Sequence, residues 1–351
     1  MPPRSARRPP FTLADKETQP GHQRTIDIPI SRLSTHTPVA MPVRVIHGRH
    51  DGPTLFVSAG VHGDEIIGAE VIRRLLSRVS PTSIHGTLLA IPVVNVFGFV
   101  THDRYLPDRR DLNRSFPGSA NGSLAGQLAH VFKREIIDRS HFGIDLHSAA
   151  VHRTNLPQIR VNPDSERAYT LGLAFGAPAL IAAPLREGSL RAIARSAGVD
   201  MLLYEAGEAL RFDEFAIRTG VKGILRVMVK LGMLHRRAVD KAPAVSARSR
   251  STYWVRAPQG GVFRALRNAG VQVREGEALG VIADPFGDEE VVVRAKSPGI
   301  IIGMATLPVV NQGDALMHIA QVQTFDTADE RIETLTANIL ADPLLDEDEV
   351  L

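Results

Sequence analysis

The chain of 351 residues contains no cysteine. This absence excludes disulfide bonds, thiolate nucleophiles, iron–sulfur clusters and every metal site built on sulfur ligands. Any metal must therefore be held by histidine and carboxylate side chains. Long hydrophobic runs are also absent, because no apolar stretch reaches the length of a membrane span. The N-terminal sequence MPPRSARRPPF has arginines without an apolar segment behind them, which predicts a cytoplasmic protein without a signal peptide.

Net charge is low for the chain as a whole, at +3, but it is unevenly distributed. Residues 326–351 contain nine acidic residues and one arginine, a charge of −8, which leaves +11 on the residues before them. A mildly basic body favours an anionic small-molecule substrate. The arginines of the N-terminal segment are not interleaved with aromatic residues, so we expect no nucleic-acid partner and no membrane partner.

Hydrophobic periodicity divides the chain into five segments. Residues 1–25 are rich in proline and arginine and predict a mobile basic arm. Residues 26–236 alternate short apolar strands with amphipathic helices, which is typical of a catalytic α/β domain with a largely parallel sheet covered on both faces. Residues 237–250 are polar and irregular, as in a linker. Residues 251–322 predict a small β-barrel or sandwich, and residues 326–351 form an acidic tail.

Polar side chains follow the predicted strands at their carboxyl ends, where the chemistry of an α/β sheet is located. His62 and Glu65 follow the strand PTLFVSAGV, and His147 lies near the end of the strand FGIDLHSA. Taken singly, each histidine is more often structural than catalytic. Together the three side chains form the open ligand set of a hydrolytic zinc, with water as the fourth ligand. Asp145 shares the strand parity of His147 and could orient its imidazole.

Two further features accompany this ligand set. Glu205 follows the strand DMLLY and is either a solvated strand end or the general base that takes a proton from water. The loop HDRYLPDRRDLNRSFPG contains four arginines: Arg104, Arg109, Arg110 and Arg114. The guanidinium groups of arginines bind carboxylates bidentately and can stabilise an oxyanion. Without a metal site nearby, the simpler interpretation of this loop would be a solvent-exposed stretch of charged residues.

The motifs HGDE, DLNRSFPG, DLHSA and EAGE occur in this order, and together they make the chain resemble the succinylglutamate desuccinylase/aspartoacylase family, which is related to the zinc carboxypeptidases. The resemblance covers about residues 52–234 and extends into the β-domain. It implies a zinc-carboxypeptidase-like α/β fold with a mainly parallel sheet flanked by helices, followed by a small all-β barrel-sandwich domain. It also implies one Zn²⁺ per chain, bound by His62, Glu65 and His147, with Glu205 as base and then proton donor to the leaving amine.

The same resemblance implies how the substrate is held. Asn113 and Arg114 would clamp its carboxylate. The pair Arg104-Tyr105 matches an Arg-Tyr pair that precedes the D-x-N-R motif, so Arg104 is assigned to the oxyanion. The spacer LPDRR is longer than in compact family members, which leaves Arg109 and Arg110 as alternatives. Three residues after the third ligand would shape the acyl or carboxylate pocket: Arg153, Asn155 and Arg160.

The β-domain resembles biotinyl/lipoyl-type barrel-sandwich folds in the runs GGVFRALRNAGVQVREGEALGVI and VVVRAKSPGIII. Such folds carry a modified lysine at a hairpin tip, whereas residues 284–288 at the corresponding tip include no lysine. We therefore reject a swinging-arm role. We expect the domain to cap or narrow the active-site entrance, or to form the interface of a homo-oligomer.

The preferred function is a zinc-dependent deacylase that cleaves the amide bond of a small anionic N-acyl amino acid. The first alternative is a zinc metallocarboxypeptidase that trims a peptide or an amino-acid tail with the same ligands and carboxylate clamp. The second is a non-catalytic ligand-binding protein on the same fold, against which the intact ligand set and Glu205 argue. Pocket depth and the position of the β-domain would separate the deacylase from the carboxypeptidase, and the sequence gives neither.

Overall fold

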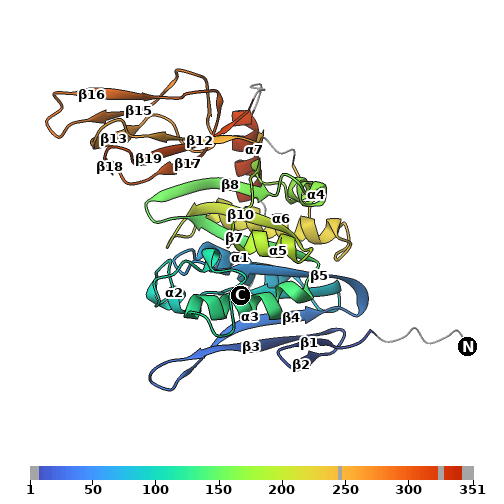
Figure 1. Cartoon of the computed structure of the whole chain (residues 1–351). Helices are drawn as coiled ribbons and strands as arrows, with labels where there is room; N and C mark the ends of the chain where they lie inside the picture. Colours follow the sequence, from blue (N-terminus) through green and yellow to red (C-terminus); the bar gives the residue numbers. More distant parts are fainter. Residues whose placement is uncertain (1–7, 244–246, 323–327, 342–351) are drawn as a thin grey trace, which may run out of the picture.

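The computed structural model describes residues 8–243, 247–322 and 328–341, and one long mixed β-sheet runs through the molecule (Figure 1). The parallel centre of this sheet consists of four strands: β6 (His85–Ile91), β5 (His50–Ala59), β7 (Phe142–Ala149) and β10 (Asp200–Glu208). Every residue of β7 is buried, as expected for a strand covered on both faces. The arrangement confirms the predicted α/β fold class.

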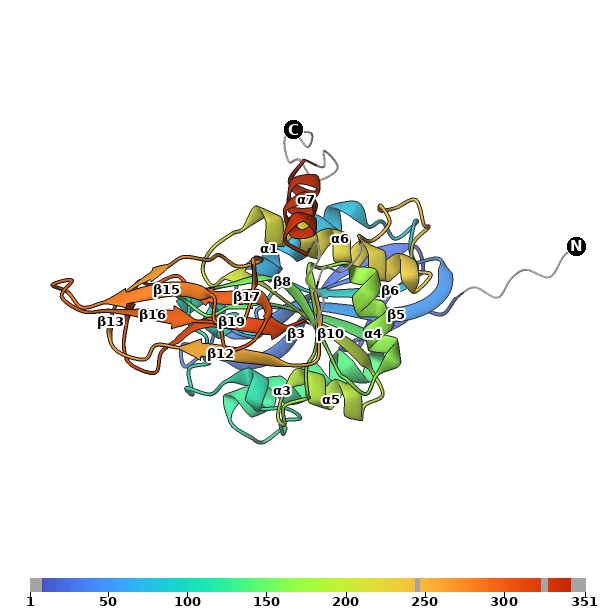
Figure 2. The same ribbon diagram turned by 90° about the horizontal axis from the view of Figure 1, so that it is seen from above.

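Helices cover both faces of the sheet and bury an apolar cluster on each. On one face lie α1 (Ile67–Arg78), α4 (Glu166–Phe175) and α6 (Glu214–Lys230). On the other lie α2 (Val96–Thr101), α3 (Leu124–Glu135) and α5 (Leu190–Ser196). Figure 2 shows α1 and α6 on one side of the sheet and α3 and α5 on the other. None of the described helices is both long and apolar enough to cross a membrane.

The N-terminal strands extend the sheet to its edge. β4 (Pro38–His47) pairs antiparallel with β6, and β3 (His22–Arg32) pairs antiparallel with β4. Along β3 the residues Ile26, Ile28 and Ile30 are buried while Asp27 and Pro29 between them are exposed, so this strand has one face on the core and one toward solvent.

The basic segment before β3 is ordered where the structure describes it, so the predicted mobile arm is wrong from residue 8 onward. This segment forms an antiparallel hairpin of β1 (Phe11–Leu13) and β2 (Lys16–Thr18). The Arg8 guanidinium donates to the backbone carbonyls of Gly48 and Gly86, at 2.9 and 2.8 Å, and this anchors the start of the segment. The prediction for residues 1–7 lies outside the described residues.

The β-domain joins the main sheet directly. β17 (Gly299–Ala305) pairs antiparallel with β8 (Arg153–Val161), which itself pairs with β10. β19 (Ala315–Gln321) and β12 (Thr252–Arg256) then extend the same sheet beyond β17. The α/β part and the β-domain are therefore linked by backbone hydrogen bonds as well as by the chain between them.

A second sheet closes the core of the β-domain. Its four antiparallel strands are, in order, β16 (Glu290–Arg294), β15 (Ala278–Ala283), β13 (Gly261–Ala265) and β18 (Val309–Val310). Side chains from this sheet and from β12, β17 and β19 enclose one apolar cluster. The remaining short elements are β9 (Ala179–Ala182), β11 (Ala247–Ser249), β14 (Gln272–Val273), η1 (Leu112–Arg114) and η2 (Ile137–Arg139).

Two segments predicted to lie outside the domains also contain elements. Within the predicted linker, β11 pairs in parallel with β9, so residues 247–249 belong to the sheet. Within the predicted acidic tail, α7 (Ala328–Leu340) packs against α6. Ile332 of α7 joins an apolar cluster that contains residues of both β8 and β17. This helix therefore reinforces the joint between the two parts of the molecule.

Close packing at the centre of the sheet generates a stability prediction. Gly143 of β7 lies opposite Phe56 of β5, and a Cβ there would be 2.2 Å from Cζ of the Phe56 ring. Phe56 packs edge-on against Phe132 at 5.9 Å, so its ring has little room to retreat. We expect Gly143→Ala to lower the free energy of unfolding by about 1–3 kcal/mol in urea denaturation.

The matched control is Gly126→Ala in α3, where the nearest atom to a new Cβ is 3.4 Å away. Because alanine favours a helix more than glycine does, this change should leave the free energy of unfolding unchanged or raise it. Identical urea midpoints for wild type and Gly143→Ala would contradict the packing argument.

Candidate active site

The turn after β5 places the first two predicted ligands. His62 and Glu65 are 4% and 3% exposed, and both lie between the end of β5 and the start of α1. Gly63 between them has no room for a side chain, since a Cβ would lie 2.0 Å from the carbonyl carbon of Gly98 in α2. The close approach of α2 therefore holds this turn against the sheet, with both side chains buried.

The third predicted ligand reaches the same point from β7. Nδ1 of His62 lies 2.6 Å from Oε1 of Glu65, and Nδ1 of His147 lies 2.7 Å from Oε2 of the same carboxylate. One ligand atom from each of the three residues lies within 4.8 Å of the others. Two imidazole nitrogens and a carboxylate thus converge at one buried position, as the sequence predicts.

The outer nitrogen of each histidine contacts a second carboxylate. Nε2 of His147 lies 2.7 Å from Asp145, whose other oxygen accepts a hydrogen bond from the Ser58 hydroxyl at 2.7 Å. Nε2 of His62 lies 3.1 Å from Asp111. Metal-binding histidines are commonly oriented in this way, with the nitrogen that faces away from the metal bonded to a carboxylate. Sequence reasoning found Asp145 and missed Asp111, although Asp111 begins the DLNRSFPG motif.

Opposite charges alternate through this cluster. Burial raises the pKa of the Glu65 carboxyl, but the His62 and His147 imidazoles reverse this and hold its pKa well below the usual range. Burial lowers the pKa of His147, but Asp145 and Glu65 reverse this and raise its pKa well above the usual value. Glu65 therefore stays ionised near neutral pH. A metal ion that displaces the imidazole protons would be attracted by the negative charge of this carboxylate.

Of the three arginines considered for the oxyanion, Arg104 is the one that the structure brings to the cluster. Its guanidinium donates to Glu65 at 3.2 Å and to Asp111 at 3.1 Å. Arg109 and Arg110 are both exposed, and neither lines the cavity beside the cluster. Arg110 lies 4.0 Å from Asp108 instead.

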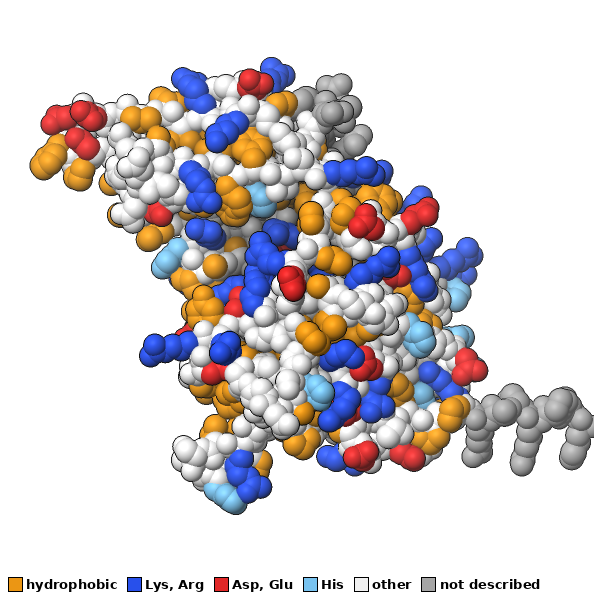
Figure 3. Space-filling view, viewed as in Figure 1, with side chains coloured by type: hydrophobic (Ala, Val, Ile, Leu, Met, Phe, Trp, Pro, Cys, Tyr) orange, Lys and Arg blue, Asp and Glu red, His pale blue; other side chains and the backbone are white. Residues whose placement is uncertain are grey.

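A cavity of about 660 Å³ opens beside the cluster. Glu205 lines it from β10, and the Asn155 amide donates to Oε2 of Glu205 at 3.0 Å. The cavity also brings together the other predicted substrate-binding residues: Asn113, Arg114, Arg153 and Arg160. Figure 3 shows basic side chains gathered between the β-domain and the α/β part on this face. An anionic ligand fits such a lining.

Several residues of this cavity carried no recognisable sequence signal. Arg186 and Arg191 add two cations to it. Burial and the neighbouring Arg160 lower the pKa of Arg191 to about 10, although Glu205 opposes the shift. The β-domain contributes three more lining residues: Trp254, Met304 and His318. The β-domain thus forms part of the cavity wall.

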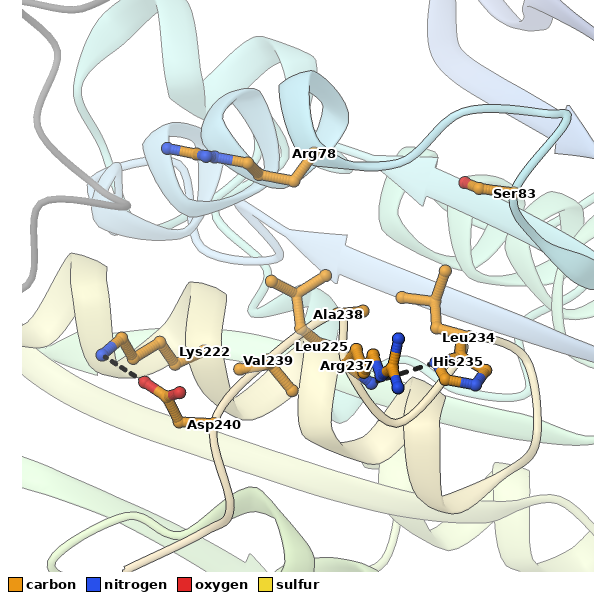
Figure 4. Close-up of a pocket in the computed structure, with 10 residues that line it drawn as sticks. All are labelled: Arg78, Ser83, Lys222, Leu225, Leu234, His235, Arg237, Ala238, Val239 and Asp240. Atoms are coloured by element: carbon orange, nitrogen blue, oxygen red, sulfur yellow. Dashed lines mark hydrogen bonds and ion pairs between the residues drawn. The ribbon is translucent and has the colours of Figure 1, made fainter.

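A separate cavity of about 370 Å³ lies between the end of α1 and the segment that follows α6 (Figure 4). Its polar lining includes Lys222, which lies 4.0 Å from Asp240. None of the predicted site residues lines this cavity, and the one histidine among its lining residues is His235. The chemistry-bearing side chains therefore belong to the larger cavity beside His62.

The comparisons with known proteins identify an amide-bond hydrolase with an α/β fold. The sequence pattern of the Succinylglutamate desuccinylase/Aspartoacylase catalytic domain matches residues 51–231, just over half of the chain. The chain belongs to this family of amide-bond hydrolases, which confirms the resemblance carried by the four motifs.

Two curated relatives have named activities. The chain is 27% identical over 336 residues to the N-alpha-acetyl-L-2,4-diaminobutyric acid deacetylase of Halomonas elongata, covering 87% of this chain and 98% of that protein. It is 32% identical over 170 residues to the succinylglutamate desuccinylase of Pseudomonas aeruginosa, covering 44% of this chain and 48% of that protein. The match to the deacetylase therefore includes the β-domain as well as the catalytic part.

Solved structures share the fold. A succinylglutamate desuccinylase/aspartoacylase from Rhodobacter sphaeroides is 26% identical, with a TM-score of 0.75 and coverage of 86% of this chain and 96% of that one. The product-bound ectoine utilization protein EutE (DoeB) from Ruegeria pomeroyi is 21% identical, with a TM-score of 0.77 and coverage of 90% and 98%. Both likenesses extend over nearly the whole of the solved chains.

The joint between β8 and β17 generates a prediction about this site. Gly303 of β17 lies opposite Asn155 of β8, and a Cβ on Gly303 would be 2.6 Å from the Asn155 side-chain oxygen. We expect Gly303→Ala to displace the Asn155 amide from Glu205 and to slow amide hydrolysis, by up to ~100-fold for a shift of about 1 Å. Steady-state kinetics and a thermal melt measure the two effects separately.

Gly260→Ala in the same β-domain is the matched control, because the nearest atom to its new Cβ is 3.5 Å away. Its kinetics should equal those of wild type. A Gly303→Ala protein with wild-type turnover would show that hydrolysis does not depend on the observed position of the Asn155 amide beside Glu205.

Proposed function

We propose that the protein is a zinc-dependent deacylase that hydrolyses the amide bond of a small, anionic N-acyl amino acid. The observation that carries this proposal is the convergence of His62, Glu65 and His147 beside a basic cavity that also contains Glu205. The relatives named as a deacetylase and a desuccinylase support the same substrate class. The cavity of about 660 Å³ suits a small molecule.

The ligand set fits zinc. Two imidazole nitrogens and one carboxylate are a common three-ligand set of catalytic zinc sites, and a fourth position stays open for water or substrate. Each histidine already has its outer nitrogen on a carboxylate, which presents Nδ1 toward Glu65. When bound, the zinc ion would polarise the amide carbonyl and make a water molecule easier to deprotonate.

Glu205 acts as the general base in this proposal. It takes a proton from the attacking water, whose oxygen bonds to the acyl carbon. It then gives that proton to the amine nitrogen as the carbon–nitrogen bond breaks, and an acid and an amine leave. The Asn155 amide holds Oε2 of Glu205, and this orients Oε1 for the proton transfer.

Basic residues hold the substrate and the developing charge. Arg104 lies beside Glu65, where its guanidinium stabilises the oxyanion of the tetrahedral species. Arg114 and Asn113 clamp the substrate carboxylate. The Asn113 side-chain oxygen accepts from the backbone N–H of Leu190 at 2.9 Å, so the start of α5 fixes its orientation. Arg153 extends the basic lining toward the β-domain.

The carboxypeptidase alternative needs space for a peptide beyond the scissile bond. Trp254, Met304 and His318 of the β-domain line the cavity instead, which favours a short substrate. This supports the deacylase over the peptide-trimming enzyme. A cytoplasmic location and a homo-oligomeric state stay predictions.

Glu205→Gln tests the base. The amide keeps the shape of the side chain but cannot accept the proton, so we expect turnover to fall by at least ~100-fold while zinc content stays near one ion per chain. The measurement combines metal analysis with amine release from N-acetyl and N-succinyl amino acids and from dipeptides. His147→Ala should lose both zinc and turnover. Near-wild-type turnover in Glu205→Gln would remove Glu205 from the mechanism.

Asp145→Ala tests how the third ligand is oriented. Removal of this carboxylate leaves Nε2 of His147 without its acceptor, so we expect zinc affinity to fall by about 10–100-fold. Competition with a chromophoric chelator measures this affinity. Asp288→Ala, at an exposed turn of the β-domain, is the control and should bind zinc as wild type does. Equal affinities for all three proteins would contradict the orienting role.

A further inference from the structure

An apolar groove of about 480 Å³ lies between the start of α1, the end of α2 and the segment before α6, and we call it the α1–α2 groove. Five apolar residues line it: Ile66, Ala69, Phe99, Leu210 and Phe212. Three polar residues complete the lining: Glu70, Arg73 and His102. Phe212 is 63% exposed and Leu210 is 39% exposed, so the groove presents large apolar side chains to solvent. Such a surface suits the apolar side chains of a polypeptide segment.

The α1–α2 groove shares a wall with the turn that carries two of the candidate metal ligands. Ile66 directly follows Glu65 in the chain. The backbone N–H of Leu210 donates to the Asp64 carbonyl at 2.9 Å, and this bond ties the segment before α6 to the same turn. A segment that fills the groove therefore packs against the outer side of the turn.

A series of polar contacts leads from the end of α7 to the groove. Arg218 of α6 donates to the Leu340 carbonyl at 3.2 Å and also contacts Glu214. Glu214 accepts from Arg74 of α1 at 2.7 Å, and Arg74 donates at 2.7 Å to Glu70 in the groove lining. α7 packs against α6 (Figure 2), and α6 packs against α1. The end of α7 and the groove are thus joined across two helices.

The residues after α7 are long enough to cover this path. It crosses about one turn of α6, one interhelical spacing and one turn of α1, which general helix dimensions put at about 20–25 Å. Residues 342–351 follow α7 and lie outside the described residues. Ten residues of extended chain span about 33 Å. Residues 342–351 can therefore reach the groove while α7 keeps its position.

The sequence of residues 342–351 complements the groove in polarity and in charge. Leu344 and Leu345 form an apolar pair. The segment contains no basic residue and five acidic ones: Asp342, Asp346, Glu347, Asp348 and Glu349. The groove and the path to it carry four arginines: Arg73, Arg74, Arg211 and Arg218. Glu70 and Glu214 balance two of these four charges, so this surface attracts an acidic segment.

We propose that residues 342–351 fold back onto the α1–α2 groove of their own chain. Leu344 and Leu345 pack against its apolar lining, and the acidic side chains lie on the arginines around it. The occupant is this segment because it begins at the end of the path and matches both the apolar lining and the surrounding charge. Docked there, it braces the turn of His62 and Glu65 from outside.

The absence of cysteine allows a direct test by disulfide trapping. Ala69→Cys places one thiol in the groove, and Leu344→Cys or Leu345→Cys, used in turn, places the other in the segment. Ser77→Cys replaces Ala69→Cys in the matched control, because Ser77 is exposed on the same helix and does not line the groove. The equilibrium of each disulfide with glutathione gives the effective concentration of the two thiols.

We expect at least one leucine position to give an effective concentration with Ala69→Cys that is tenfold or more above its value with Ser77→Cys. Ser77 is three residues from Arg74, which lies on the path from α7, whereas Ala69 is five residues away. An undocked segment would therefore favour Ser77 at least as much as Ala69. The difference should disappear in concentrated urea, where the chain is unfolded.

Phe212→Ser tests whether the groove itself holds the segment. We expect this change to lower the effective concentration of the Ala69→Cys pair at least fivefold, because it removes an apolar wall of the groove. Phe286→Ser is the matched control, since Phe286 is 86% exposed at the turn between β15 and β16, and it should leave the value unchanged. Circular dichroism checks that both variants are folded.

Equal effective concentrations with Ala69→Cys and Ser77→Cys, at both leucine positions, would overturn the proposal. Trapping that is unchanged in Phe212→Ser would also overturn it. A disulfide between two chains, visible as a dimer on a non-reducing gel, would do the same because it would assign the groove to the segment of another copy. None of these measurements uses substrate or zinc, so the outcome is independent of the proposed function.

Discussion

The register of three parallel strands determines where the chemistry lies. β7 pairs in parallel with β5 on one side and with β10 on the other, and in the second pairing Glu205 lies directly opposite His147. The proposed base and the third ligand are thus neighbours because two strands share hydrogen bonds. A shift of one residue in that register would turn one of the two side chains to the opposite face of the sheet. The apolar core that fixes this register therefore also positions the site.

This dependence explains which parts of the site could be predicted from the sequence. Buried apolar strands show clearly in the sequence, and parallel strands end at the same edge, so the convergence of His62 and Glu65 with His147 follows from local patterns. Trp254 and His318 reach the cavity only because β17 pairs with β8, and no local periodicity encodes such a distant antiparallel pairing. The N-terminal hairpin was missed for a related reason, because Arg8 anchors it through backbone carbonyls far along the chain.

The cavity concentrates charge of one sign. Six arginines line it, and among the described residues only Arg104 of these six pairs with a carboxylate. The lowered pKa of Arg191 reflects the cost of holding such cations together away from water. An anion that enters the cavity relieves this repulsion, so its binding also stabilises the folded chain by mass action. Under the proposed function, recognition and stability would be coupled through the same side chains.

The pairing of β17 with β8 also has a consequence during synthesis on the ribosome. Residues 153–155 of β8 present unpaired backbone groups until residues 303–305 have been translated and have left the exit tunnel. At ordinary elongation rates this interval is on the order of 10 s, long enough for an uncovered strand edge to meet another nascent chain. The catalytic half of the chain therefore depends on its own last third, or on a chaperone, to protect that edge from aggregation.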